Sequence, residues 1–342
     1  MMAAGPRPQR PLSPAAGTGT ERKEATLHGQ LIVVTGASGN IGRRLSELLL
    51  EGHRRVRVVA RGETHLRAAA ERGAEALTGD LADAGFTRRA FVGAHAAFTM
   101  LPPVMAEHDL RADQNRISEA IAFGLREARV PFVVNLSSIG AEVPYGTGPI
   151  AGLHDHEERL DRLDDTHVVH LRPTFFMENH LHAIGAILHG GVYPSTLRGD
   201  LPLPMIAARD IADEAARLLA GLEFEGKSTQ SLLGARDYTL QQAAQILGAA
   251  IGKPELRYLQ VADEQAREAM VAQGMPAHLA DQMLEMNRAW NSGKVRPAEP
   301  RLPENTTLTT LESWAPHFAD AYRHHQHPPH HAPGDAAGPS RH

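Results

Sequence analysis

The sequence predicts an α/β protein: a doubly wound parallel sheet of the Rossmann type, followed by a small mixed α/β lobe. Two observations carry this prediction. Short apolar runs typical of buried strands alternate with helical patterns from residue 31 to about residue 171. The first run, Leu31 to Val34, leads directly into TGASGNIG, and a helical pattern follows. A strand, a glycine turn and a helix in this order are typical of a dinucleotide pyrophosphate site.

The turn after the first strand has the residues that such a site needs. Gly36, Gly39 and Gly42 are spaced as GxxGxxG, one residue longer than the usual GxGxxG fingerprint. Glycines let the backbone turn tightly and approach the phosphates, and the next helix offers free N–H groups and its positive dipole end. An ordinary glycine-rich turn is the alternative, and the flanking strand and helix argue against it.

The next two strands predict how the adenosine end is bound. The strand Val56 to Ala60 ends at Arg61, where an Asp or Glu would bind the ribose of NAD. A guanidinium favours the 2′-phosphate of NADP instead, with a solvated arginine as the alternative. A third strand, Glu75 to Thr78, leads to Asp80. Its carboxylate either accepts a hydrogen bond from the adenine amino group or caps a turn.

Three later strands are expected at Ala96 to Leu101, Phe132 to Leu136 and His167 to Leu171, with a helix from about His108 to Arg129. Because ligands lie beyond the carboxyl ends of parallel strands, the residues just after these strands are candidates for the nicotinamide end of the site. They are Leu101 to Pro103, Ser137, Ser138 and Arg172 to Thr174. The prolines among them are also common in ordinary loops.

After Pro173 the pattern changes to short strands and amphipathic helices, which predicts a substrate-side lobe. Helices are expected from Asp210 to Gly221 and from Thr239 to Ile251, with Asp210 and Thr239 as their N-caps. Two more are expected near residues 262–273 and 277–291, and the four methionines in or between them are more often core than binding surface. The expected division is a disordered tail at 1–27, a dinucleotide-binding domain at 28–180 whose sheet later segments complete, a substrate lobe at 181–322, and a His/Pro-rich tail at 323–342.

Composition excludes several classes of protein. A net charge of −5 without a basic block argues against a nucleic-acid surface. The chain has no cysteine, which excludes disulfides, thiolate nucleophiles and cysteine zinc sites. No segment resembles a signal peptide or a membrane span, so a cytoplasmic location is expected. The histidines of the C-terminal tail can bind metal loosely, but a solvated tail is the favoured interpretation and no metal site is predicted.

The acid/base pair of many Rossmann reductases, a tyrosine followed four residues later by a lysine, is missing. Residues 28–180 contain no lysine, and Pro149 stands four residues after Tyr145, which is expected in a loop. Weak candidates for moving a proton are Ser138, His154 and His156. The two histidines do not share one helical face, and a polar helix N-terminus on the surface is the favoured alternative for them.

Several segments together resemble the NmrA-like branch of the atypical short-chain dehydrogenase/reductase superfamily. They are TGASGNIG, Arg61, GDL at 79–81, NLSSIGA at 135–141, LRPTFFMEN at 171–179 and ARDIADEAARLL at 208–219. The resemblance spans nearly all of residues 30–295, and LRPTFFMEN is its most distinctive piece. It implies an NAD(P)-binding Rossmann domain with a small C-terminal lobe. Some members reduce quinones, azo dyes or similar acceptors, and others are cofactor-sensing regulators.

Carried onto this sequence, the resemblance implies a set of cofactor-binding residues. The pyrophosphate would be surrounded by Gly36, Ser38, Gly39, Asn40 and Ile41, with Gly42 completing the turn. Arg61 would bind the 2′-phosphate, and adenine would be bordered by Asp80 and Leu81. The ribose and nicotinamide would be flanked by Leu101 and Ser137, and the nicotinamide ring would lie against Pro173, Phe175 and Phe176. Many members place a lysine on the helix beginning near Leu153, and His154 or His156 stands there in this chain.

The predicted function is therefore an NADP(H)-binding oxidoreductase that transfers a hydride to a small organic acceptor, such as a quinone or an azo compound. NAD is the second choice of cofactor. An acceptor of this kind can take its proton from water, so the missing tyrosine and lysine do not prevent its reduction. The alternative is a non-catalytic NAD(P)-sensing regulator that binds a protein partner.

Overall fold

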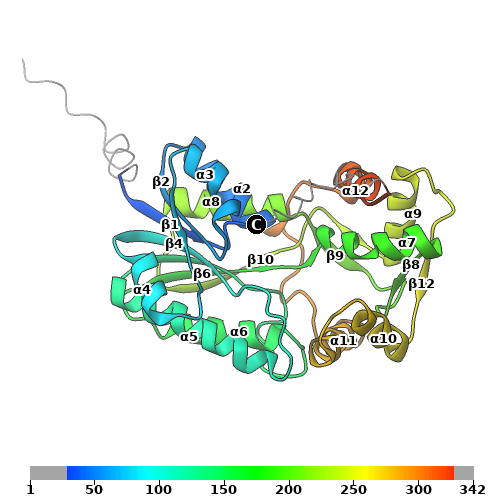
Figure 1. The fold of residues 1–342 in the computed structure, drawn as a ribbon. Coiled ribbons are helices and arrows are strands. Elements are labelled where there is room, and N and C mark those ends of the chain that lie inside the picture. The colour runs from blue at the N-terminus through cyan, green and yellow to red at the C-terminus, as the bar shows by residue number, and fades with distance from the viewer. Residues whose placement is uncertain (1–28, 327–342) are drawn as a thin grey trace, which may run out of the picture.

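The computed structural model describes residues 29–326 (Figure 1). The tail expected at residues 1–27 lies outside this range, as does the C-terminal tail from residue 327 onward. Residues 323–326 belong to the last helix, α12 (Leu311–Gln326). No helix within residues 29–326 is long and apolar enough to cross a membrane.

Seven parallel strands form the central sheet in the order β10-β6-β5-β4-β1-β2-β3. Their bounds are β1 (Leu31–Thr35), β2 (Arg55–Ala60), β3 (Glu75–Thr78), β4 (Ala94–Met100), β5 (Phe132–Leu136), β6 (His167–Pro173) and β10 (Lys227–Leu232). The chain reverses its direction of travel across the sheet between β1 and β4, and ligands bind at such a switch point in doubly wound sheets. The predicted fold class is confirmed.

Helices cover both faces of this sheet (Figure 1). One face carries α2 (Asn40–Glu51), α3 (Arg67–Glu71) and α8 (Ala208–Gly221), and the other carries α4 (Ala84–Phe91), α5 (Leu110–Ala128) and α6 (Ile150–Asp161). Each face has its own apolar core, with Leu45 and Ile211 on the first side and Ile121 and Leu160 on the second. A sheet buried on both faces explains why its strands are nearly continuous apolar runs.

After β6 the chain forms a smaller part beyond the carboxyl ends of the strands (Figure 1). Its strands are β7 (Phe175–Phe176), β9 (Leu203–Ile206) and β11 (Asp237–Tyr238) in one sheet, and β8 (Val192–Ser195) with β12 (Arg257–Gln260) in another. Its helices are η2 (Met177–Ala183), α7 (Ile184–Gly190), α9 (Leu240–Ala250), α10 (Asp263–Ala272), α11 (Ala277–Asn291) and α12. Short 3-10 turns, η1 (Glu63–His65) and η3 (Pro303–Asn305), lie in loops. This part has its own apolar core, which includes Tyr238 and Phe318.

One predicted helix cap is wrong and one is confirmed. Helix α8 begins at Ala208, so Asp210 lies in its first turn rather than before it. The Glu178 carboxylate accepts from the Ala208 N–H, with both oxygens at 3.1 Å, and so caps the helix from a different segment. Asp210 instead accepts from the Thr309 hydroxyl at 2.6 Å. Thr239 caps α9 as predicted, in a capping box with Gln242.

Candidate functional site

The glycine turn between β1 and α2 is packed so closely that two of its positions admit only glycine. Gly36 has a φ of +64°, and a Cβ built on it would lie 2.9 Å from the Sδ of Met100 at the end of β4. A Cβ on Gly42 would lie 2.3 Å from the Gly36 carbonyl oxygen. The two glycines thus let helix α2 start directly against the sheet, as a turn that binds a pyrophosphate requires.

Helix α2 presents an uncapped N-terminus at this turn. Its N-cap residue, Gly39, has no side chain to cap the helix, and the first turn holds no acidic residue. The Arg43 N–H donates to the Gly39 carbonyl oxygen at 2.9 Å, so the helical ladder begins there. Ser38 and Asn40 are exposed beside these amides. Free N–H groups and the positive end of the dipole make this turn suitable for an anion such as a pyrophosphate.

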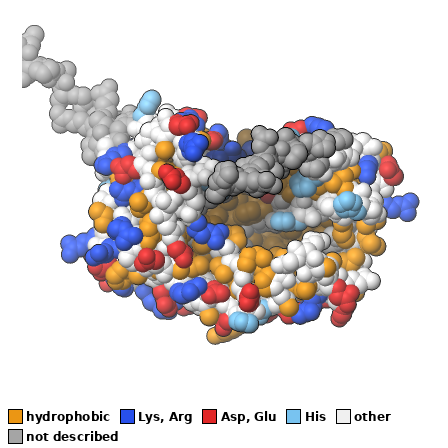
Figure 2. Space-filling view, viewed as in Figure 1, with side chains coloured by type: hydrophobic (Ala, Val, Ile, Leu, Met, Phe, Trp, Pro, Cys, Tyr) orange, Lys and Arg blue, Asp and Glu red, His pale blue; other side chains and the backbone are white. Residues whose placement is uncertain are grey.

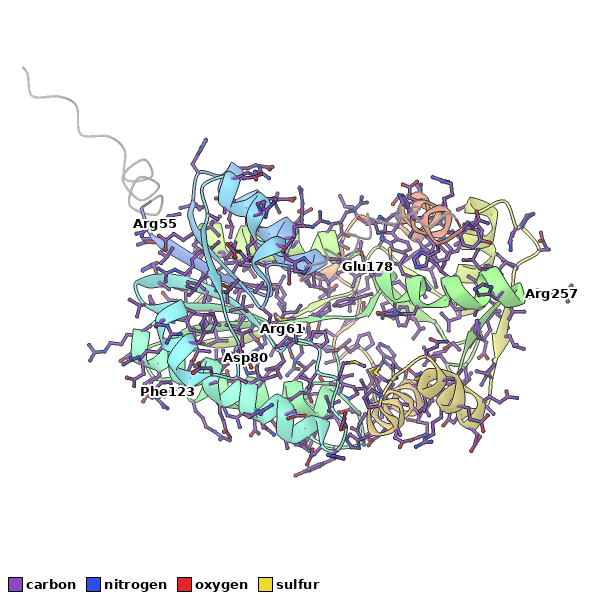
Figure 3. The ribbon with its side chains drawn as sticks, viewed as in Figure 1. Arg55, Arg61, Asp80, Phe123, Glu178 and Arg257 are labelled. Carbon is purple, nitrogen blue, oxygen red and sulfur yellow. The ribbon has the colours of Figure 1, made fainter. Side chains whose placement is uncertain are left out.

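Arg61 and Asp80 follow the paired strands β2 and β3, and both lie near the middle of the molecule, where the sheet meets the smaller part (Figure 3). The exposed Arg61 forms no hydrogen bond or ion pair with any residue from 29 to 326. Asp80 Oδ1 accepts from the Ala82 N–H at 2.9 Å, so this carboxylate does cap a turn. Its Oδ2 has no partner among the same residues, which leaves one oxygen for an adenine amino group.

Ser137 is a buried polar residue that directly follows β5. It is 5% exposed, and its Oγ has no hydrogen-bond partner within the part of the chain that the structure describes. A buried hydroxyl left unpaired costs free energy that a ligand can recover. Ser137 Oγ and the glycine turn therefore both fit a dinucleotide.

The apolar residues among the predicted cofactor-binding residues differ in how deeply they are buried. Leu81 and Leu101 are buried in the core of the α4/α5 face, so they lie beneath the site's loops rather than on their surface. Pro173 is buried at the end of β6. Phe175 and Phe176 form the half-buried strand β7, at the start of the smaller part.

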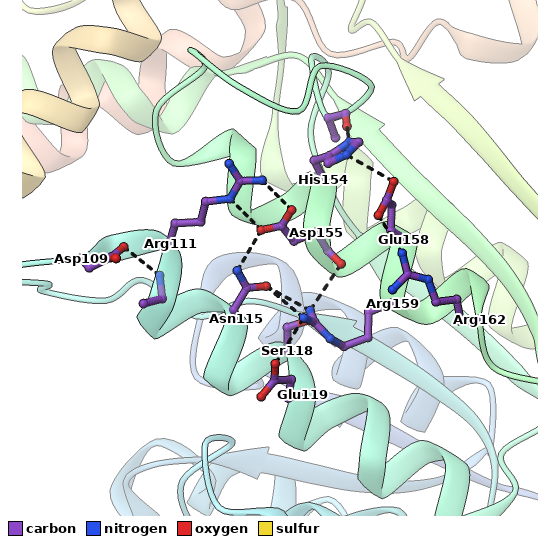
Figure 4. Close-up of polar contacts among 12 residues, drawn as sticks. Asp109, Arg111, Asn115, Ser118, Glu119, His154, Asp155, Glu158, Arg159 and Arg162 are labelled. Atoms are coloured by element: carbon purple, nitrogen blue, oxygen red, sulfur yellow. Dashed lines mark hydrogen bonds and ion pairs between the residues drawn. The ribbon is translucent and has the colours of Figure 1, made fainter.

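Two of the three candidates for moving a proton form hydrogen bonds with backbone carbonyl oxygens. Ser138 Oγ donates to the neighbouring Ile139 carbonyl oxygen at 3.0 Å. His154 Nδ1 lies 2.7 Å from the Ala141 carbonyl oxygen, so this nitrogen carries the proton and donates it. His154 Nε2 lies 3.5 Å from Glu158 Oε1 (Figure 4). His154 thus contacts the loop after β5, close to where the family lysine was expected.

The surface position expected for His156 is wrong. This residue is fully buried between α6 and α5, and its Nδ1 lies 2.7 Å from Ser118 Oγ. Arg159 Nη1 donates to the same hydroxyl at 2.6 Å (Figure 4). The hydroxyl must then donate to Nδ1, which leaves the proton of the neutral ring on Nε2. Burial, together with the charges of His170 and Arg159, lowers the pKa of His156 to about 3. His156 is therefore a structural group and is not placed to act on a ligand.

The loop after β5 contacts residues 282–295, which the sequence pattern did not predict. A Cβ on Gly148 would lie 2.1 Å from the Gln282 carbonyl oxygen of α11, and one on Gly140 would lie 3.0 Å from the Val295 side chain. Lys294 Nζ donates to the Tyr145 carbonyl oxygen. The only earlier sign of this contact is the run of glycines in GAEVPYGTG, residues 140–148.

A hollow separates the carboxyl edge of the sheet from the smaller part, and hydrophobic and histidine side chains are visible in it (Figure 2). Large exposed apolar side chains occur in the loops that follow β4 and β5, where Met105 is 64% and Tyr145 is 69% exposed. Arg111 lies over the Tyr145 ring at 5.0 Å from its centroid. Exposed aromatic and thioether side chains of this kind can pack against a flat, unsaturated organic molecule.

Comparison with known proteins agrees with this geometry. The family model for NAD(P)H-binding proteins matches residues 36–219. An NAD(P)H azoreductase of Xenophilus azovorans is 30% identical over 258 residues, covering 75% of this chain and 86% of the azoreductase. The NADPH complex of an Escherichia coli quinone oxidoreductase superposes with a TM-score of 0.69 at 24% identity, over 84% of this chain and 99% of that one. The transcriptional regulator NmrA, bound to NAD, gives a TM-score of 0.61 at 16% identity, over 88% and 95% of the chains.

The fold and the glycine turn define a Rossmann-type dinucleotide-binding protein. The chain belongs to the NAD(P)H-binding family, and the expected likeness to NmrA is confirmed at the level of the fold. Its cofactor class is therefore NAD(P)H.

Proposed function

We propose that this protein is an NADP(H)-dependent reductase that transfers a hydride to a small, flat organic acceptor such as a quinone or an azo compound. The observation that carries the proposal is the uncapped glycine turn together with Arg61, whose exposed guanidinium has no partner within residues 29–326. A guanidinium at this position can form two parallel hydrogen bonds to the 2′-phosphate, the group that distinguishes NADP from NAD. The 30% identity with an NAD(P)H azoreductase supports the acceptor class.

In this proposal the bound nicotinamide supplies the hydride, and the chain binds and orients. The N–H groups at the start of α2 bind the pyrophosphate, and Arg61 binds the 2′-phosphate. Ser137 Oγ, buried beside the end of β5, bonds the ribose or the carboxamide. The apolar loop residues Met105 and Tyr145 exclude water from one side of the acceptor.

The placement of the two histidines considered as proton donors also supports this acceptor class. His156 is sealed inside the protein, while His154 donates to a backbone carbonyl. A ketone or aldehyde needs a positioned acid as the hydride arrives, whereas a quinone accepts the hydride readily and then takes its proton from water. Electron-poor acceptors are therefore the ones that this site reduces fastest.

The test uses the purified full-length protein with NADPH and a panel of quinones, azo dyes and aldehydes. We expect quinones or azo dyes to oxidise NADPH, as followed by its absorbance, and aldehydes to react far more slowly. Tight NADPH binding with no oxidation by any acceptor would contradict the reductase and favour a sensing role like that of NmrA. Failure to bind either dinucleotide would overturn both.

A further inference from the structure

Tyr145 has an open aromatic ring that is nevertheless held in one position. The residue is 69% exposed, and its hydroxyl forms no hydrogen bond with residues 29–326. The Arg111 guanidinium lies over the ring, 5.0 Å from its centroid, and Lys294 Nζ donates to the Tyr145 carbonyl oxygen. An exposed ring gains little from burial, so these contacts fix its position without adding it to a core.

Arg111, in the first turn of α5, is itself held by Asp155 of α6 (Figure 4). Arg111 Nε donates to Asp155 Oδ2 and Nη2 donates to Oδ1, each at 2.7 Å, which makes the pair bidentate. Asn115 Nδ2 donates to Asp155 Oδ2 at 2.8 Å. The Arg111 hydrogen bonds hold the pKa of Asp155 below its ordinary value, so the pair stays charged at neutral pH. The guanidinium that lies over the ring therefore has little freedom to move.

These contacts lie at the carboxyl edge of the sheet, where the candidate cofactor site also lies. Tyr145 belongs to the loop that follows β5 and begins with Ser137, and α5 and α6 start at this edge because each follows a parallel strand. The backbone on either side of Tyr145 is also fixed, since Gly140 packs on Val295 and Gly148 packs on α11. Because the guanidinium lies over one face of the ring, the opposite face provides the open surface.

We propose that the open face of Tyr145 stacks on an aromatic ring of the acceptor, and that Arg111 and Asp155 are positioning residues that hold the Tyr145 ring for this contact. Offset stacking of two flat rings is favourable, and it costs less entropy when one ring is already fixed. The contact grows with the area of the partner, so a naphthoquinone, with two fused rings, should bind better than a benzoquinone. The inference rests on the proposed function for the class of ligand, and it selects the aromatic acceptors within that class.

The test measures ligand binding without turnover, by calorimetry of the full-length protein with naphthoquinone and with benzoquinone. NADP⁺ is present in one series and absent from the other, and because NADP⁺ has no hydride to transfer, the quinones are not reduced. Tyr145→Ala should weaken naphthoquinone binding about fivefold or more, and benzoquinone binding less. Tyr145→Phe keeps the ring and should bind like the wild type, because the hydroxyl has no partner within the described residues. The chain has no cysteine, so no thiol adds to the quinones.

Arg111→Met and Asp155→Asn should each weaken naphthoquinone binding about threefold, since the ring remains but is no longer fixed. Arg116→Met is the matched control, because Arg116 lies on the same helix and pairs with Asp113 at 3.1 Å rather than lying over a ring. In the Tyr145→Ala background, Arg111→Met should have no further effect. If the Arg111 pair only stabilised the fold, its loss would instead weaken binding equally with and without the ring.

The stacking contact is ruled out if Tyr145→Ala binds naphthoquinone as tightly as the wild type, if Arg111→Met has its full effect without the ring, or if the wild type binds neither quinone in either series. These outcomes are separate from the failure of the reductase. Naphthoquinone that binds through Tyr145 but does not oxidise NADPH would contradict the reductase and leave the contact in place. Oxidation of NADPH by quinones or azo dyes, with quinone binding unaffected by Tyr145→Ala, would keep the reductase and remove the contact.

Discussion

At the scale of single residues, Arg61 and Ser137 stand out because each offers a polar group that residues 29–326 leave without a partner. The two groups differ in burial: the guanidinium is exposed and hydrated, whereas the hydroxyl is enclosed. Their removal should therefore have different effects on cofactor choice and on stability.

Arg61→Ala should weaken NADPH binding more than tenfold and leave NADH binding nearly unchanged, since a charge-assisted bond to a phosphate is worth about 1.5 to 3 kcal/mol. Calorimetry with both cofactors measures this. Arg72→Ala is the control, because Arg72 is an exposed arginine of the same region that pairs with Glu51 at 3.0 Å. An equal loss of affinity for NADPH and NADH would show that Arg61 does not bind the 2′-phosphate.

Ser137→Ala should not lower the free energy of unfolding, because the Oγ has no bond in the described protein to lose and its burial without a partner is itself unfavourable. NADPH affinity should fall several-fold, since a ligand hydrogen bond disappears. Urea unfolding and cofactor titration of the same variant test both statements. A destabilised variant with unchanged affinity would assign Ser137 to the core and not to the site.

At the scale of elements, helix α8 depends on a residue 30 positions before it. The Glu178 carboxylate accepts from the Ala208 N–H and, at 3.3 Å, from Trp314 Nε1. Glu178→Ala leaves both donors unpaired and should cost about 2 to 3 kcal/mol of unfolding free energy. Thr239→Ala removes an ordinary local cap of α9 and should cost about 1 kcal/mol. Urea midpoints that reverse this order would show that α8 is capped by its own first turn.

The contrast between a local cap, such as Thr239, and a cap from a distant segment, such as Glu178, explains what the sequence could and could not predict. The strands, the glycine turn and the Thr239 cap depend on residues within a few positions of one another, and the pattern alone located them. The Glu178 cap and the pairing of His156 with Ser118 join segments 30 and 38 residues apart. A histidine in a polar helical stretch looks exposed until the facing helix is known, and the packing of Gly148 on α11 is equally invisible in the local pattern.

At the scale of the whole molecule, two buried histidines make stability depend on pH. Burial lowers the pKa of both His156 and His180 to about 3, against 6.5 for the free side chain. Between these values the two histidines bind two more protons in the unfolded chain than in the folded chain, so together they lower stability on acidification by about 2.7 kcal/mol per pH unit. Glu178 acts in the opposite direction, because burial raises the pKa of its carboxyl.

The contribution of one histidine can be isolated. His156→Gln should reduce the pH slope of the unfolding free energy by about 1.4 kcal/mol per unit below about pH 6. Glu178 contributes equally to the pH slope of both proteins, so its contribution cancels in the comparison. Urea unfolding of the wild type and the variant at two pH values gives the two slopes. Identical slopes would mean that His156 is protonated in the folded protein.

The close packing of Gly140 and Gly148 on residues 282–295 has a consequence for synthesis. A ribosome delivers the glycine turn at residues 36–42 early and α11 near the end. The loop after β5 therefore acquires this covering only when residues 282–295 have been made. Interrupted translation would yield polypeptides in which this loop still faces bulk water.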